Sequence, residues 1–181
     1  TFEEKSLKEA KQLTQGLAAS PGAAVGGIYF TAQEAVEAAK TKPVILVREE
    51  TSPEDIEGMI SSEAIVTLRG GMTSHAAVVA RGMGKCCVCG CQNMIINYAE
   101  KTLKIAGVIL HEGDTISVDG SSGKVYLGEV DKVDAKFSDR FNKLLGWADG
   151  IRELKVLANA DNETDAKVAF EFGAEGIGLC R

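Results

Sequence analysis

The sequence predicts an α/β protein with a mixed sheet, followed by a helix and a short β-α-β unit. Short runs of β-branched and apolar residues alternate with segments of helical periodicity between residues 25 and 91. Strands separated by turn residues follow between residues 104 and 127. The chain has 181 residues, of which 45% are hydrophobic and 25% charged, so it can form one good core.

The first half of the chain alternates between expected strands and expected helices. Residues 3–15 are charged and favour an incoming helix or a linker, which the Ser-Pro-Gly run at residues 20–22 ends. Thr31 and Ser52 are expected to cap helices, because a hydroxyl can accept a free N–H group of the first turn. The expected strands are residues 25–30, 43–48, 64–68 and the cysteine-rich run from residue 86, and the expected helices are residues 32–40 and those after residues 52 and 74.

The second half begins with strands and ends in a β-α-β pattern. Residues 104–110, 115–119 and 124–127 are expected to be strands, with turns at residues 112–114 and 119–123. A linker helix is expected over residues 137–147, with an apolar face of Phe137, Phe141, Leu144, Leu145 and Trp147. Residues 155–159, 163–172 and 176–179 are expected to form a strand, a helix capped by Asp161 or Asn162, and a second strand, as at the start of a TIM barrel.

These elements divide the chain into four expected segments. They are an N-terminal linker or helix at residues 1–19, a main α/β domain at residues 20–129, a linker helix at residues 130–150, and the start of a barrel at residues 151–181. Two strands cannot close a barrel, so we expect the chain to be part of a larger protein.

The stretch GGMTSHAAVVAR, which begins at Gly70, carries the clearest functional signal. Gly70 and Gly71 permit a tight turn, Thr73 or Ser74 can cap the following helix, and His75 then lies in its first turn. A helix N-terminus offers unpaired N–H donors and a partial positive charge, which favour an anion and disfavour an imidazolium ring. The pattern therefore predicts a histidine that carries a phosphoryl group. A capped core helix with an incidental histidine is the alternative.

This stretch resembles the phosphohistidine signature of the phosphoenolpyruvate-utilising enzymes. Four more segments resemble the pyruvate phosphate dikinase branch of that family, namely residues 17–24, 51–59, 80–88 and 173–181. Met72 favours the same branch, because phosphoenolpyruvate synthase and the first enzyme of the bacterial sugar phosphotransferase system usually carry arginine there. Phosphoenolpyruvate synthase, which needs no phosphate as co-substrate, is the alternative enzyme. A non-catalytic docking module is the alternative of another class.

The resemblance implies a swivelling β/β/α phosphohistidine domain whose histidine moves between two active sites. On that pattern His75 takes a diphosphoryl group from MgATP and releases AMP. Phosphate then removes the terminal phosphoryl group as diphosphate, and the remaining phosphohistidine converts pyruvate to phosphoenolpyruvate. In plant members the threonine two residues before the histidine is a regulatory phosphorylation site, which makes Thr73 a candidate. Arg181 is implied to bind the phosphate or carboxylate of phosphoenolpyruvate.

The same resemblance implies partners outside this chain. An ATP-grasp nucleotide-binding domain and the rest of the barrel that binds pyruvate and phosphoenolpyruvate belong to the same enzyme, which is expected to be a homodimer. Mg²⁺ is expected on those domains, where it would neutralise phosphate charge. This chain alone is expected to be inactive in the full reaction, and its linkers at residues 1–19 and 130–150 to act as hinges. A cytoplasmic location is expected, with a plastid or glycosome as the alternative in eukaryotes.

Charge and apolar patterning exclude other classes of protein. The net charge of −6 argues against a nucleic-acid or anionic-membrane surface. No apolar run approaches the about 20 residues that a transmembrane helix needs.

The cysteines and arginines near the histidine stretch have structural interpretations. Four cysteines cluster at residues 86, 87, 89 and 91, but no second ligand pair follows them, and His111 stands apart as a surface residue. We therefore expect a buried strand of reduced thiols and no metal site in this chain. Arg69 and Arg81 flank the histidine stretch, and either could touch the phosphoryl group. Arg81 better suits the end of the helix, paired with a carbonyl or an acid.

Overall fold

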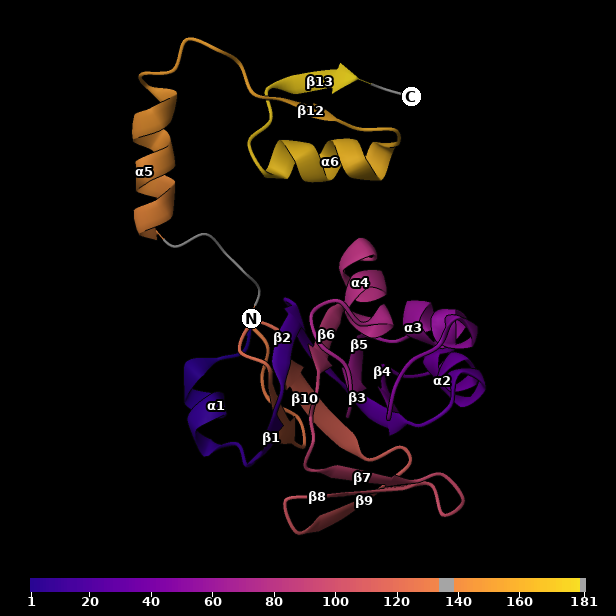
Figure 1. Cartoon of the computed structure of the whole chain (residues 1–181). Helices are drawn as coiled ribbons and strands as arrows, with labels where there is room; N and C mark the ends of the chain where they lie inside the picture. Colours follow the sequence, from indigo (N-terminus) through magenta and orange to yellow (C-terminus); the bar gives the residue numbers. More distant parts are fainter. Residues whose placement is uncertain (134–138, 180–181) are drawn as a thin grey trace. The chain divides into compact units, whose positions relative to one another are not determined.

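The computed structural model describes residues 1–133 and 139–179, in two compact units. The first unit is Thr1–Ala135 and the second is Lys136–Arg181. Figure 1 shows the elements of each. None of the helices in the described residues is long and apolar enough to cross a membrane.

The first unit is built on one eight-stranded mixed sheet, in the order β1-β11-β10-β3-β4-β5-β6-β2. Its centre is parallel, from β3 through β4 and β5 to β6, and the flanking pairs are antiparallel. A parallel sheet covered on both faces needs continuous apolar strands, which is what the sequence of the central strands provides. The strands are β1 (Gln12–Gln15), β2 (Leu17–Ser20), β3 (Ala23–Tyr29), β4 (Val44–Arg48), β5 (Ala64–Thr67), β6 (Cys86–Cys89), β10 (Thr115–Asp119) and β11 (Lys124–Leu127).

Three helices cover one face of this sheet (Figure 1), and they pack mainly through alanines, with Met59 contributed by the second of them. They are α2 (Ala32–Ala39), α3 (Ile56–Ser61) after a short 3-10 turn at Pro53–Asp55, and α4 (His75–Gly82). The predicted caps are confirmed at two of them, since Thr31 accepts the N–H of Glu34 and Ser74 accepts that of Ala77. Alanines at positions 76, 77 and 80 let α4 lie close to the sheet.

A second, three-stranded antiparallel sheet covers the other face. It consists of β7 (Met94–Asn97), β8 (Thr102–Ile105) and β9 (Val108–His111). Its apolar side chains join the core cluster on that face of the large sheet. The layers are thus sheet, sheet and helices, which confirms the predicted β/β/α domain.

The prediction of a single strand over residues 104–110 was wrong. The chain reverses at Ala106 and Gly107, whose φ angles are +49° and +75°, and β8 and β9 form a hairpin. Alanine rarely adopts a positive φ, so the turn has no clear sequence signal. The strand β7 was also not predicted.

The N-terminal segment differs from the expected linker, because most of it is part of the domain. A short helix α1 (Glu4–Glu9) leads into β1, which pairs with β11, and β2 pairs with β6. Phe2 is buried with Val25, Tyr126 and Val130. The strand partners lie far away in sequence, and no local pattern at residues 1–19 reveals them.

One residue, Gly16, separates β1 from β2, although these strands lie at opposite ends of the sheet order. The two edges of the sheet therefore meet at this glycine, and the sheet curls round. The N–H of Gly16 donates to the carbonyl of Gly123 at 2.8 Å. A Cβ at Gly16 would lie 2.4 Å from the carbonyl oxygen of Cys89, so only glycine fits this closure.

The second unit contains the predicted linker helix and β-α-β unit. Its elements are α5 (Asp139–Asp149), β12 (Leu157–Asn159), α6 (Glu163–Glu171) and β13 (Gly176–Leu179). β12 and β13 pair in parallel, and Asn162 caps α6 by accepting the N–H of Asp165 at 2.9 Å. Phe137 lies outside the described residues.

Candidate active site

His75 is the first residue of α4, where the turn after β5 ends. Ser74 is the N-cap of this helix, and its Oγ accepts the N–H of Ala77 at 3.4 Å. Thr73 precedes the cap and is exposed. Of the two residues expected to cap the helix, Ser74 does so.

The ring of His75 is held by a buried threonine. Thr51, only 6% exposed, places its Oγ1 at 3.1 Å from Nδ1 of the ring. Within residues 1–133 and 139–179 the other ring nitrogen, Nε2, has no hydrogen-bond partner. A threonine hydroxyl can donate or accept, so this contact fits either tautomer of the ring. In the tautomer whose Nδ1–H donates to Oγ1, the lone pair of Nε2 is free to attack.

Sequence reasoning did not single out Thr51 as a site residue. Its signal lies in the topology, because β4 and β5 are neighbouring parallel strands and their carboxyl ends share one edge of the sheet. Thr51 follows β4, and His75 follows β5. The two loops therefore meet at that edge.

Of the two glycines at the start of the histidine stretch, only Gly70 is sterically required. Gly70 has a φ of +108°, and a Cβ there would lie 2.8 Å from Cβ of Ser74. A side chain at Gly70 would therefore displace the cap. A Cβ at Gly71 would meet nothing within 4 Å, and its carbonyl accepts the N–H of Ser74 at 3.0 Å.

Arg81 ties the histidine stretch to β2. Its guanidinium donates to the carbonyl of Met72 at 2.6 Å and to that of Ala19 at 3.2 Å. The expected pairing with a carbonyl is confirmed, and these two bonds hold the guanidinium on the backbone. Arg81 thus fixes the loop that precedes the cap.

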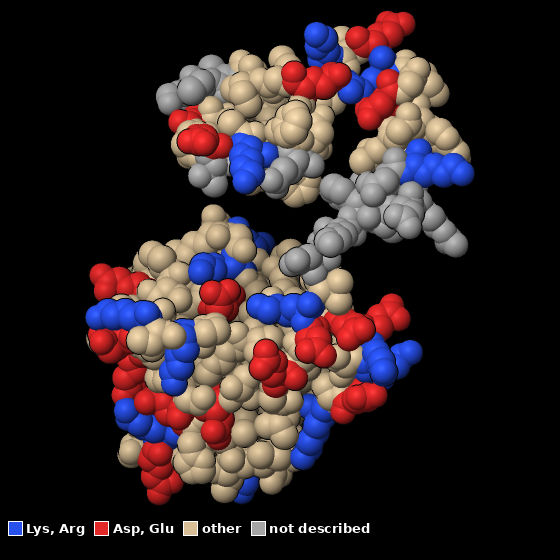
Figure 2. Space-filling model, turned by 180° about the vertical axis from the view of Figure 1, so that it is seen from behind, with Lys and Arg blue, Asp and Glu red and all other residues tan. Residues whose placement is uncertain are grey.

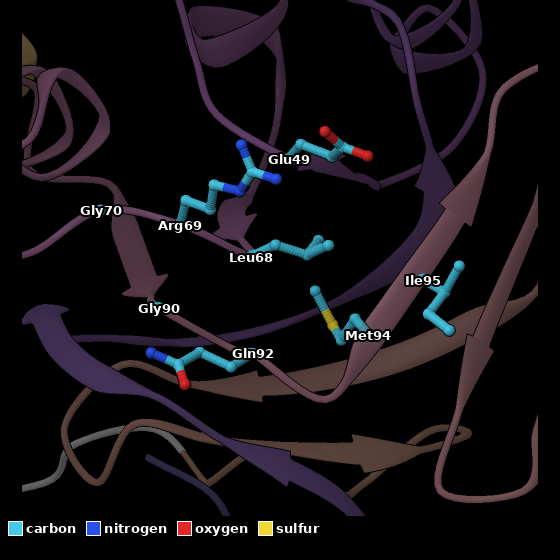
Figure 3. A pocket seen from close by; sticks show the side chains of 8 residues that line it. All are labelled: Glu49, Leu68, Arg69, Gly70, Gly90, Gln92, Met94 and Ile95. Carbon is cyan, nitrogen blue, oxygen red and sulfur yellow. The ribbon is translucent and has the colours of Figure 1, made fainter.

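Arg69 lines an open hollow of about 510 Å³ beside the same loop. Figure 3 shows Arg69 and Glu49 on one side of it, Gln92 on the other, and the apolar side chains of Leu68 and Met94 between them. Its remaining lining is Gly70, Gly90 and Ile95.

The predicted buried cysteine strand is β6, which contains Cys86, Cys87 and Cys89, and Cys91 is buried just after it. Cys87 and Cys89 share a core cluster with α4. Sγ of Cys89 lies 3.6 Å from Sγ of Cys87 and 3.7 Å from Oγ of Ser74. The contact with Cys89, burial and the neighbouring thiols raise the pKa of Cys87. The contact with Cys87, together with hydrogen bonds to Thr67 and Ser74, lowers the pKa of Cys89. Burial raises the pKa of Cys86 and of Cys91 to about 12.

Two further expectations concern a metal site and Arg181. In the part of the chain that the structure describes, no three histidine, cysteine, aspartate or glutamate side chains gather as a metal site would need. Arg181 lies outside the described residues.

On the face of the first unit seen in Figure 2, acidic and basic side chains are interspersed rather than gathered by sign.

Comparison with known proteins gives two family matches. Residues 40–123 match "PEP-utilising enzyme, mobile domain", and residues 135–181 match "PEP-utilising enzyme, PEP-binding domain".

Curated relatives resemble the whole chain. A pyruvate, phosphate dikinase of Clostridium symbiosum is 55% identical, across 100% of this chain and 21% of the relative. One of Entamoeba histolytica is also 55% identical, across 93% of this chain and 19% of the relative. Pyruvate, phosphate dikinase 2 of Zea mays is 52% identical, across 99% of this chain and 20% of the relative. The chain thus spans about a fifth of the length of these relatives.

Proposed function

The chain belongs to the phosphoenolpyruvate-utilising enzymes, and from this premise we propose that it is the phosphocarrier region of a pyruvate, phosphate dikinase. The observation that carries the proposal is the ring of His75, fixed at Nδ1 by Thr51 at the N-terminus of a helix. The names of the relatives, each about half identical to the chain, support the same reaction.

Nε2 of His75 is the attacking atom in this proposal. It forms a bond to the β-phosphorus of ATP, the bond from that phosphorus to the oxygen bridging to the α-phosphate breaks, and AMP leaves with the electron pair. An oxygen of inorganic phosphate then takes the terminal phosphoryl group and leaves as diphosphate. The enolate oxygen of pyruvate takes the remaining phosphoryl group, which gives phosphoenolpyruvate and returns the lone pair to Nε2.

The surroundings of His75 suit each charge state of this cycle. When Nε2 carries a phosphoryl group, Nδ1 keeps its proton and still donates to Thr51, so one hydrogen bond serves both states. The free N–H groups and positive end of α4 favour the added negative charge.

Thr73 is proposed as a regulatory phosphorylation site, because plant members of the family are regulated at the threonine two residues before the histidine. It is exposed and lies two residues before His75. A phosphate there would add a charge of about −1.5 to −2 beside the nucleophile and oppose the arrival of a second phosphoryl group.

The remaining parts of the proposal concern the larger protein. A nucleotide-binding domain and a complete barrel would supply the two sites that the carrier visits, and Mg²⁺ would act there. The described residues of this chain provide no ligand cluster for that ion. Arg181 is proposed to bind phosphoenolpyruvate once the barrel is complete. Homodimer formation and a cytoplasmic location remain part of the proposal for the whole protein.

Intact-mass analysis tests the carrier role. The chain is incubated with phosphoenolpyruvate, Mg²⁺ and an active complementing barrel domain. We expect an acid-labile gain of one phosphoryl group, which H75A abolishes. H111A is the matched control, since His111 is exposed at the end of β9 and should leave the gain unchanged.

Two outcomes would overturn the proposal. One is no gain with a barrel that is shown to be active. The other is the same gain in H75A. In the full-length enzyme, ATP-dependent turnover that needs no inorganic phosphate would instead identify a phosphoenolpyruvate synthase.

A further inference from the structure

We propose that Asp55 and Arg48 are positioning residues for the ring of His75, acting through the loop that carries Thr51. The inference rests on the proposed function, because it gives these residues a part in phosphoryl transfer. Its structural content is the juxtaposition of three groups: the guanidinium of Arg48 at the end of β4, and the Thr51 hydroxyl and the buried Asp55 carboxylate on the segment that follows.

Asp55 fixes the backbone next to Thr51. Its carboxyl group is buried, with the residue 4% exposed, and Oδ2 accepts the N–H of Ser52 at 2.9 Å. The other oxygen, Oδ1, lies 3.3 Å from Nε of Arg48. This approach is an attraction between charges rather than a formed hydrogen bond, because Nε has no hydrogen-bond partner among the described residues. A buried charge is stable only when it is paired, so each of the two groups holds the other in place.

Arg48 is itself anchored to the rest of the domain. It is the last residue of β4, and its guanidinium donates to the carbonyl of Phe30 at 3.0 Å. The same group lies 5.5 Å from the centroid of the Tyr98 ring. The hydroxyl oxygen of Tyr98 accepts the N–H of Glu49 at 3.2 Å. The loop is thus held by the end of β3, by the carboxylate of Asp55 and by the turn after β7.

This anchoring matters because Thr51 reaches the histidine with a short side chain. Its hydroxyl meets Nδ1 at 3.1 Å, and hydrogen bonds weaken steeply once they lengthen or bend. A shift of about 1 Å in the loop would break the bond and release the ring to exchange tautomers. In this proposal Oγ1 of Thr51 accepts from Nδ1–H, so Arg48 and Asp55 favour the tautomer with the proton on Nδ1 by holding the loop. Neither residue is placed in contact with the reacting atoms.

Asp55 could instead serve only to start the helix that follows, since it also closes the turn at Ser52. Ring-nitrogen NMR separates the two roles. The ¹⁵N-labelled chain at mildly alkaline pH gives signals from two histidines only, and the exposed ring of His111 is the internal reference. We expect His75 of the unaltered chain to carry its proton on Nδ1.

The informative variant is D55N, which keeps the shape of the side chain and removes its charge. We expect the ratio of the Nδ1–H to the Nε2–H form of His75 to fall by about three- to tenfold, as the loss of roughly one hydrogen bond would cause. D119N is the matched control. Asp119 likewise accepts backbone N–H groups and a serine hydroxyl in a turn, but between β10 and β11.

Circular dichroism first checks that each variant is folded, and the tautomer ratio of His75 is then compared among the variants. A shift in D55N and none in D119N supports the inference. An unchanged ratio in D55N, when T51V in the same assay moves it, overturns the inference and leaves Asp55 a helix-starting residue. A proton on Nε2 in the unaltered chain overturns it too. Failure of the phosphorylation test would remove the proposed function but leave the tautomer result standing.

Discussion

His75 has two ring nitrogens, and in the described part of the chain only Nδ1 has a hydrogen-bond partner. Nδ1 meets the buried hydroxyl of Thr51, and the ring itself is half-buried at the start of α4. Phosphoryl transfer needs a lone pair aimed at a phosphorus atom, so a histidine whose ring is held in place with its proton on Nδ1 is prepared for attack before substrate arrives.

Substitution of Thr51 by valine tests this role. T51V keeps the volume and branching of the side chain but leaves Nδ1 without its partner. We expect the rate of phosphohistidine formation to fall by about tenfold, corresponding to roughly 1.4 kcal/mol. T51S, which restores the hydroxyl, should recover most of the rate. Quench-flow measurement of the phosphorylated fraction gives these rates. Equal rates in T51V and the unaltered chain would contradict the role of Thr51 in preparing His75 for attack.

At the scale of elements, the start of α4 depends on how closely the chain before it can pack. Gly70 lies against the cap residue Ser74, whereas Gly71 faces open space. The same two-residue signal in the sequence therefore contains one glycine that is sterically required and one that is not.

The pair G70A and G71A separates these cases. We expect G70A to lower the free energy of unfolding by about 2 to 4 kcal/mol, because a positive φ and a contact below van der Waals distance coincide there. G71A should change it by less than about 0.5 kcal/mol. Urea titration followed by circular dichroism measures both, and a similar loss in the two variants would show that the loop tolerates neither side chain.

Elements with local signals were predictable from the sequence, and elements made by distant partners were not. Thr31, Ser52 and Asn162 begin their helices as expected, because capping depends on residues within one turn. The hairpin at Ala106 and Gly107 was missed, since alanine gives no sign of a left-handed conformation.

The candidate site shows the same division. His75 stands in a contiguous stretch and could be predicted. Its partner Thr51 and the anchors Arg48 and Asp55 lie more than one element away, and only the parallel pairing of β4 with β5 brings them near.

At the scale of the whole molecule, the two units differ in how well they cover their apolar side chains. The first unit has core clusters on both faces of its large sheet. Within residues 139–179, the second unit has two paired strands with α6 packed on them, although parallel sheets are normally covered on both faces. Its large apolar residues remain exposed, for example Ile151 at 83%, Leu154 at 84% and Phe170 at 77%.

Shortening the chain to residues 1–133 tests this difference. We expect the shortened chain to unfold in one cooperative transition and to bind much less of the dye ANS than the full chain, because the exposed apolar residues named above are gone. Fluorescence titration at equal concentrations measures the binding. Undiminished dye binding would place the accessible apolar surface in the first unit instead.

Gly16, where the two edges of the large sheet meet, has a consequence for solubility. Unpaired strand edges present rows of N–H and C=O groups that recruit strands from other molecules. In this protein one stretch, residues 12–20, covers both β11 and β6. Detachment of that stretch would therefore bare two edges together. One of them is β6, a wholly apolar strand of the kind that seeds intermolecular β-pairing, so the short N-terminal stretch protects the domain against aggregation at both ends of its sheet.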